Sequence, residues 1–202
     1  VGSGMWTVVS GTANVTTPAS PTSAVTGLTV GASSTLRWTI TNGSCPASID
    51  DIIITVDELP TTANAGVDQD LCNVTTTTLA GNTPAVGSGM WTVISGSASV
   101  TTPASPTSGV TGLTVGASAT LRWTVTNGSC PASTDDVIIN VASPPTTAAA
   151  GPDQNLCNTT TATLAGNTPV SGSGMWSVIA GAASVTTTGS PTSGVTGLTV
   201  GA

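Results

Sequence analysis

The chain has 202 residues and a net charge of −7, with nine acidic residues, two arginines, no lysine and no histidine. Because phosphate backbones and anionic lipids are bound mainly through Lys and Arg, this composition argues against nucleic acid and acidic membranes as partners. Only 5% of the residues are charged and 38% are hydrophobic, which is not the composition of a disordered chain. No apolar run reaches about 18 residues, so we predict no membrane insertion.

The commonest residue types predict an all-β protein. Thr, Val, Ser, Gly, Ala and Pro dominate the sequence. β-Branched side chains fit the pleated surface of a sheet, whereas Gly and Pro form the turns between strands. We therefore expect short strands and turns rather than helices.

The sequence repeats itself every 85 residues. The segment that begins at Val1 and ends at Trp6 returns at residues 86–91 and again at residues 171–176. Its methionine stands at positions 5, 90 and 175, and 90 − 5 = 175 − 90 = 85. This unit is too long for one coil of a solenoid and is close to the roughly 100 residues of a self-contained β-sandwich.

The repeat divides the chain into three expected domains. Residues 1–59 would be the C-terminal part of one repeat, with strands C to G, and residues 60–144 a complete repeat. Residues 145–202 would be the N-terminal part of a third repeat, with strands A to E. The boundaries fall where a Pro-Thr-Thr segment begins, at Pro60 and Pro145. The chain would then be a window cut from a longer array.

Turn signals in the complete repeat predict the seven strands of an immunoglobulin-like sandwich. The clearest alternation places Leu121, Trp123 and Val125 on one face of a single strand. In chain order, we expect strands A (63–71), B (75–80), C (90–95), D (98–102), E (109–115), F (120–126) and G (137–141).

Two tryptophans of the complete repeat are the expected core anchors. Trp91 on strand C and Trp123 on strand F would supply nearly all the aromatic burial, because the chain has no Phe or Tyr. A sugar-stacking platform is the alternative role for them. The neighbouring Met90 would point away from Trp91, into solvent. This methionine and its equivalents are a possible contact surface in every copy: Met5, Met90 and Met175.

Four cysteines without histidine and without a C-x-x-C spacing indicate disulfides and an oxidising compartment. Cys72 would lie at the A–B corner and Cys130 in the F–G loop, with Cys157 and Cys45 as their equivalents. Three pairings remain open: Cys72 with Cys130, Cys72 with the F–G cysteine of the following copy, and Cys45 with Cys72. The first pairing requires the F–G connection to fold back, because a seven-residue strand spans about 23 Å and bridged Cα atoms lie within about 7 Å.

The acidic residues suggest no catalytic site. Without histidine or lysine the usual general bases are missing, and the acid pairs recur in a fold too small for a deep cleft. Four acids near the first domain junction are candidate Ca²⁺ ligands, and we expect no other cofactor. At the second junction the first two are replaced by Ala142 and Ser143, which favours the alternative that all four are solvated turn residues. These acids are Asp57, Glu58, Asp68 and Asp70.

Several segments together resemble the PKD-like, immunoglobulin-like repeats of very long bacterial surface proteins. They are residues 63–72, 79–83, 112–116, 121–130 and 132–139. The resemblance covers the whole chain and implies cell-surface adhesins and gliding-type filaments, exported by a type IX-like route in Gram-negative bacteria. The Trp-Asp-Phe-Gly-Asp motif of the PKD domain proper is missing, and residues 90–93 stand in its place.

We therefore expect a non-enzymatic, extracellular repeat region that forms a stalk or filament on a cell surface. Its partners would be neighbouring copies of itself, joined end to end and packed laterally. The alternative is a multivalent module in which each repeat carries a weak site for a glycan or a surface, so that repetition provides avidity.

Overall fold

The computed structural model describes residues 2–200 of the chain. Val1, which begins the first repeated segment, and residues 201–202, which end the third expected domain, lie outside the described part. Every regular element of residues 2–200 is a β-strand, so the all-β class is confirmed. These residues contain no helix that could span a bilayer.

The middle repeat forms all seven expected strands, with different lengths from those predicted. The strands equivalent to C, F and G are longer than expected, and the other four are shorter. Ala63 and Ala65 run beside the last strand, but their amides donate to its side chains rather than to its backbone, so they form no ladder. The strands are β6 (Gln69–Cys72), β7 (Thr77–Thr78), β8 (Ser88–Ser95), β9 (Ser99–Val100), β10 (Gly109–Thr111), β11 (Ala117–Thr126) and β12 (Ser133–Ala142).

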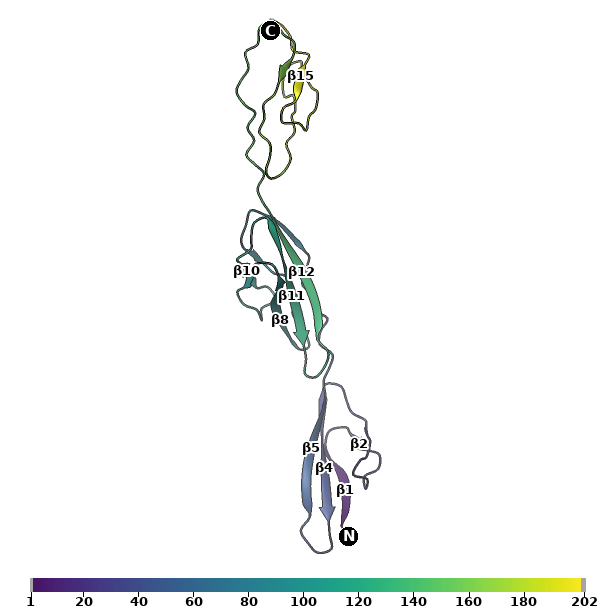
Figure 1. Ribbon diagram of the computed structural model, residues 1–202. Helices are drawn as coiled ribbons and strands as arrows, with labels where there is room; N and C mark the ends of the chain where they lie inside the picture. Colours follow the sequence, from purple (N-terminus) through teal and green to yellow (C-terminus); the bar gives the residue numbers. More distant parts are fainter. Residues whose placement is uncertain (1, 201–202) are drawn as a thin grey trace. The chain divides into compact units, whose positions relative to one another are not determined.

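These strands build two sheets, a four-stranded sheet in the order β6-β12-β11-β8 and a three-stranded sheet in the order β7-β10-β9. Figure 1 shows β8, β11 and β12 side by side. In the pairing of β8 with β11, Trp91 lies directly opposite Trp123. Along β12, the Ile138 amide donates to the Asp68 carboxylate, and the Ala142 carbonyl oxygen accepts from the Asn73 amide. The residue numbers increase in the same direction on both segments, so β6 runs parallel to β12.

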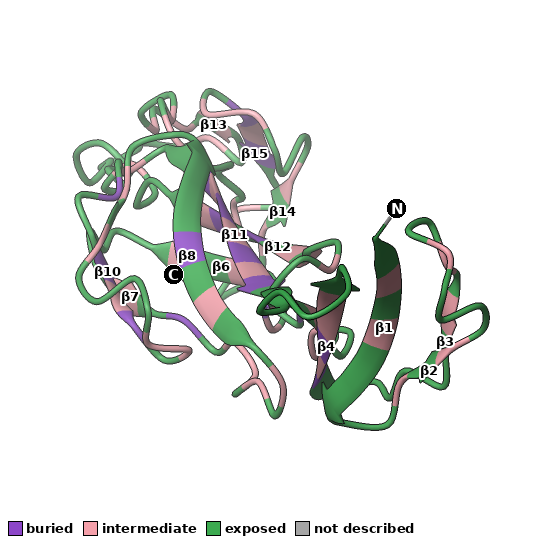
Figure 2. Ribbon diagram, turned by 90° about the horizontal axis from the view of Figure 1, so that it is seen from below, coloured by how far each residue is buried: buried purple, intermediate pink, exposed green. Residues whose placement is uncertain are grey.

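The core of the middle repeat is packed around the two tryptophans. Trp123 is fully buried and Trp91 is 2% exposed, and their ring centroids are 5.1 Å apart. Figure 2 shows the buried residues of β8, β10 and β11 in purple. The inward face predicted for strand F is confirmed. The other buried apolar residues of the middle repeat are Ala63, Ala65, Leu79, Val110, Leu113, Ala119, Leu121, Val125, Val137, Ile139 and Val141.

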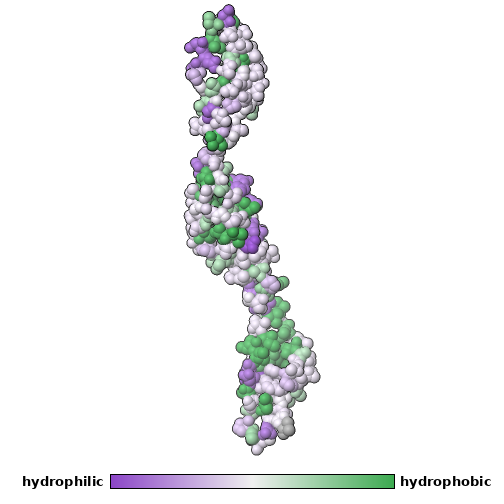
Figure 3. Space-filling model, in the orientation of Figure 1, coloured by the Kyte–Doolittle hydropathy of each residue, from purple (hydrophilic) through white to green (hydrophobic). Residues whose placement is uncertain are grey.

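The first repeat forms strands equivalent to C through G. Trp6 lies opposite Trp38, with ring centroids 5.0 Å apart, as in the middle repeat. Ile52 is 48% exposed, whereas its equivalent Val137 is 1% exposed, because residues 2–56 include no counterpart of the segments that cover Val137. Figure 3 shows a hydrophobic area on this part of the chain. The strands are β1 (Ser3–Ser10), β2 (Asn14–Val15), β3 (Val25–Thr26), β4 (Ala32–Thr41) and β5 (Ser48–Val56), in sheets β1-β4-β5 and β2-β3.

The third repeat forms fewer strands than expected. Strands A to E were predicted, but only the equivalents of B, D and E are present in its described residues. The segment equivalent to strand C stays irregular because those residues include no counterpart of β11 to pair with it. The three strands are β13 (Ala162–Thr163), β14 (Ser184–Val185) and β15 (Gly194–Thr196), in a sheet of order β13-β15-β14.

Candidate functional site

The segment 57–59, which precedes the middle repeat, is held by the loop between β11 and β12. The Asp57 carboxylate accepts hydrogen bonds from the Ser129 amide at 2.7 Å and from the Ser129 hydroxyl at 2.9 Å. Asn127 Nδ2 donates to the Glu58 carbonyl oxygen at 2.8 Å, and Cys130 Sγ lies 3.6 Å from the Asp57 carbonyl oxygen. This linker contact gathers one acid, one cysteine and two backbone carbonyls.

Gly128 is required at the centre of this contact. The φ angle of Gly128 is +51°, and that of the equivalent Gly43 is +57°. Both angles lie in the left-handed region that L side chains rarely adopt. A Cβ atom on Gly128 would also collide with the Asp57 carboxyl group. The glycine therefore lets the loop close over the acid.

The Asp57 contact is expected to weaken in acid. The hydrogen bond from the Ser129 amide, followed by that from its hydroxyl, holds the pKa of Asp57 below its ordinary value. A group with a lowered folded pKa stabilises the contact above its unfolded pKa, and this stabilisation is lost as the pH falls through the folded pKa. A pH titration followed by NMR should therefore show the Ser129 amide resonance moving in acid.

The matched control is Asp57→Asn, whose side-chain oxygen still accepts but does not titrate. In that variant the Ser129 amide resonance should stay constant over the same pH range. A wild-type resonance that is equally insensitive would contradict the contact.

The four candidate Ca²⁺ ligands are not brought together. Asp68 Oδ1 accepts from the Ile138 amide at 2.8 Å, and Asp70 Oδ1 accepts from Asn140 Nδ2 at 2.9 Å. Asp68 and Asp70 lie along β12. Asp57 instead contacts the β11–β12 loop, which precedes the first residue of β12. Residues 2–200 contain no group of three or more acids, cysteines or histidines that could hold a metal ion. The expected cluster of Asp57, Glu58, Asp68 and Asp70 is therefore corrected, because Asp68 and Asp70 lie along β12, away from the β11–β12 loop.

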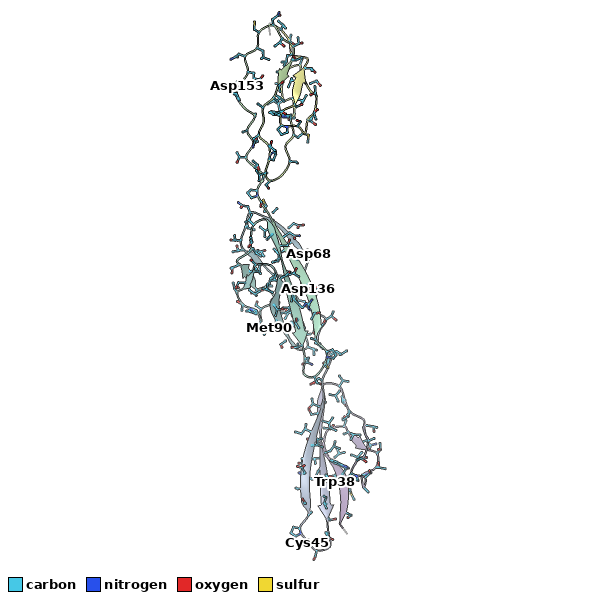
Figure 4. All side chains as sticks on the ribbon, in the orientation of Figure 1. Trp38, Cys45, Asp68, Met90, Asp136 and Asp153 are labelled. Carbon is cyan, nitrogen blue, oxygen red and sulfur yellow. The ribbon has the colours of Figure 1, made fainter. Side chains whose placement is uncertain are left out.

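The adjacent acids Asp135 and Asp136 act separately. Because successive residues of a strand point to opposite faces, Asp135 Oδ2 accepts from the Ala65 amide at 2.7 Å while Asp136 faces Arg122. Arg122 forms a two-pronged ion pair with Asp136 at 2.7 and 2.9 Å, and Arg37 pairs in the same way with Asp51. Figure 4 labels Asp136 on the sheet. The two carboxylates do not converge on one point.

Asp135 should matter for folding. The residue whose amide it accepts, Ala65, is 1% exposed, and a buried amide left without a partner costs about 1–3 kcal/mol. We expect Asp135→Ala to lower the unfolding free energy of the middle repeat by this amount, measured by urea denaturation. Asp135→Asn, which keeps an acceptor oxygen, should recover most of the loss. Equal stability of the two variants would contradict this role.

All four cysteine thiols are free in the structure. Cys130 lies three residues before β12 begins, and Cys72 ends β6 next to Asn73, which bonds to Ala142 at the last residue of β12. The ten residues of β12 span about 33 Å, far beyond the roughly 7 Å that a disulfide allows. The pairing of Cys72 with Cys130 in one copy is therefore wrong.

The pairing of Cys45 with Cys72 stays a prediction. Cys45 lies in the loop between β4 and β5, as Figure 4 shows. The nine residues of β5 separate it from the linker by about 30 Å. The pairing would require Cys72 to lie close to this loop. Cys157, the equivalent of Cys72, is exposed.

The methionine before each strand-C tryptophan is exposed, as alternation predicted. Met90 is 55% exposed on β8, and Met5 and Met175 are exposed as well. Trp91 and Trp123 point the other way, into the core, so neither offers a face for sugar stacking. A role of the methionines as a contact surface stays a prediction.

One structural residue was missed by sequence reasoning. Asn82 Oδ1 accepts from the Trp123 indole at 3.1 Å and from the Asn64 amide at 2.9 Å, while its Nδ2 donates to the Thr62 carbonyl oxygen. Asn167 repeats the two backbone bonds in the third repeat. In both copies the asparagine follows Leu-Ala-Gly, and this recurrence was the sequence signal that could have identified it.

A surface hollow of about 570 Å³ lies beside the linker that follows β12. Ala142, Ser143 and Pro145 line it on the linker side. Its other lining residues are Gly116, Ala117, Ser118, Asn140, Val141, Ser171 and Gly172. No charged side chain lines this hollow, so it offers no acid–base chemistry.

No protein-family model and no curated protein matches the chain. Among solved structures, the PKD domain from KIAA 1837 protein is 27% identical, with a TM-score of 0.36, and the match covers 46% of this chain and 93% of that one. Extracellular domains 3–5 of Drosophila OTK are 10% identical, at a TM-score of 0.31 and coverages of 82% and 63%. The human desmocollin-1 ectodomain is 8% identical, at a TM-score of 0.31 and coverages of 98% and 46%. The chain thus spans less than two thirds of the latter two.

Proposed function

We propose that this chain is a segment of an extracellular stalk or filament whose partners are neighbouring copies of the same repeat. The observation that carries the proposal is that the middle repeat buries a complete core of its own. Trp91, Trp123 and the apolar residues around them all belong to residues 60–144. A unit that closes its own core can be duplicated without redesign, and length then grows by repetition.

The charged groups support a passive role. Both arginines of the sequence, Arg37 and Arg122, are engaged by an aspartate on the neighbouring strand. Asp57, Asp68 and Asp135 accept hydrogen bonds from backbone amides. These groups serve the fold rather than a substrate, which favours a non-enzymatic protein. The resemblance to long bacterial surface repeats favours an adhesive surface fibre.

The proposal is tested by varying the number of copies. We would compare polypeptides with one, two and four copies of residues 60–144 by small-angle X-ray scattering under reducing conditions. A stalk predicts that each added copy increases the maximum dimension by the same length, while the unfolding midpoint of each copy stays similar. A maximum dimension that levels off, as in a compact particle, would overturn the proposal.

A second candidate function is multivalent binding through the exposed methionines. Met90 and Ile94 are both about half exposed on the outer side of β8, which is an apolar surface that recurs with the repeat. Such a module predicts that four copies bind a glycan array or a cell surface far more tightly than one copy, and that Met90→Ser in every copy abolishes the binding. Equal, negligible binding by one and four copies favours the stalk.

A further inference from the structure

The two cysteines of the middle repeat sit near equivalent peptide carbonyls of two successive linkers. Cys130 Sγ lies 3.6 Å from the carbonyl oxygen of Asp57, the residue that directly follows β5. At the other end of the repeat, the amide of Asn73, the neighbour of Cys72, donates to the Ala142 carbonyl oxygen at 3.0 Å. Because 57 + 85 = 142, these two carbonyls occupy the same position in the repeat.

This equivalence would bring two thiols from different copies close together. In two successive complete copies, Cys72 of the first lies one residue from the amide that binds the linker carbonyl. The β11–β12 loop of the second copy would place its cysteine, the equivalent of Cys130, on the same carbonyl. Two groups that contact one oxygen can approach closely enough for a disulfide, in contrast to the roughly 33 Å between Cys72 and Cys130 of one copy.

We infer that Cys72 forms a disulfide with the β11–β12 loop cysteine of the following copy, so that successive repeats are covalently stapled. By the same rule, Cys157 would pair with the β11–β12 loop cysteine of the copy that follows it. Cys45 and Cys130 would each pair with the equivalent of Cys72 in the copy that precedes their own. The inference rests on the proposed function only in taking the copies to be successive and the compartment to be oxidising.

The chemistry requires a disulfide oxidant, such as oxidised glutathione. One cysteine thiolate attacks a sulfur of the oxidant, forms a mixed disulfide and releases one thiolate. The second cysteine thiolate then attacks the cysteine sulfur of that mixed disulfide and expels the other half of the oxidant. In total, two protein thiols lose their protons and are oxidised to one S–S bond, while the oxidant is reduced to two thiols.

The bond removes the freedom of the linker. At position 142 no carboxylate is available to hold the loop serine, as Asp57 does in the preceding linker. The disulfide would then be the strongest contact at this junction. A chain with stapled junctions is a stiff fibre, whereas an unstapled one is a string of independently moving domains.

The test uses a polypeptide of two successive copies of residues 60–144, each of which contains all seven strands and a closed core. In the staple variant, Cys130→Ser in the first copy and Cys72→Ser in the second leave only the predicted pair. In the matched control, Cys72→Ser in the first copy and Cys130→Ser in the second leave the two outer cysteines. Both are incubated with oxidised glutathione, and maleimide labelling after denaturation counts the remaining thiols by mass spectrometry.

We expect the staple variant to lose both thiols as a monomer lighter by two hydrogens. The control should form no internal disulfide. Free thiols or glutathione adducts in a staple variant that hydrogen exchange shows to be folded would overturn the inference, as would equal internal oxidation of the control. If either variant fails to fold, the unsubstituted two-copy polypeptide decides, because it should lose two of its four thiols. Because the copy-number test is run under reducing conditions, failure of the staple and failure of the stalk are distinguishable.

Discussion

Replacing Trp123 by alanine is expected to destabilise the middle repeat strongly while the rest of the chain keeps its stability. The side chain is fully buried, packs against Trp91 and donates its indole N–H to Asn82. Truncating a buried tryptophan costs about 3–5 kcal/mol. A repeat of this size has a total stability on the order of 4–13 kcal/mol, so the loss is a large fraction of it.

Hydrogen exchange followed by mass spectrometry on the whole chain measures this effect repeat by repeat. Peptides from β8, β11 and β12 should lose protection in Trp123→Ala, while those from β4 and β5 keep it. Met90→Ala is the matched control, because Met90 lies one residue from Trp91 but is 55% exposed. Protection that persists around β11 would show that the core does not depend on this ring.

Adding a single methyl group at Gly89 is expected to have the second largest effect. Gly89 lies on β8 directly under the six-membered ring of Trp123, and a Cβ atom there would collide with that ring. Gly4 has the same relation to Trp38 in the first repeat. Overpacking of this kind costs about 1–3 kcal/mol, because the ring must leave its rotamer or the strands must separate.

The third repeat provides a matched control for this prediction. Gly174 is the equivalent of Gly89, but its added Cβ would meet only Pro169 Cγ at 3.6 Å, an ordinary contact. Proteolysis by thermolysin in increasing urea should show the middle repeat of Gly89→Ala cleaved at lower urea than in the unsubstituted chain. Gly174→Ala should leave the cleavage of the third repeat unchanged. Equal effects of the two substitutions would contradict the close packing of Trp123 on β8.

Much of the fold could be read from local sequence. The 85-residue period shows that each position has an equivalent in another copy, and β-branched residues with regular turn signals predict strands. The inward face of β11 follows from the alternation of Leu121, Trp123 and Val125, because a strand turns successive side chains to opposite faces. The exposure of Met90 follows by the same rule from the burial of Trp91.

Only the tertiary structure decided which groups meet. Asp135 and Asp136 are adjacent in sequence, yet one supports the Ala65 amide and the other pairs with Arg122, since the partners come from other segments of the chain. Asn82 reaches Trp123 across 41 positions for the same reason. A sequence period shows which residues are equivalent, but it does not show which neighbours surround them.

The cysteines show the same division most clearly. The sequence by itself determined that four thiols recur in two equivalent positions and that disulfides are expected. It left the pairing open, because spacing along a chain does not give separation in space. The parallel run of β6 along β12 excludes the pairing within one copy, by carrying Cys72 to the last residue of β12 while Cys130 stays before the first. Separation in space depends on strand direction, which is a property of the folded sheet and not of any one segment.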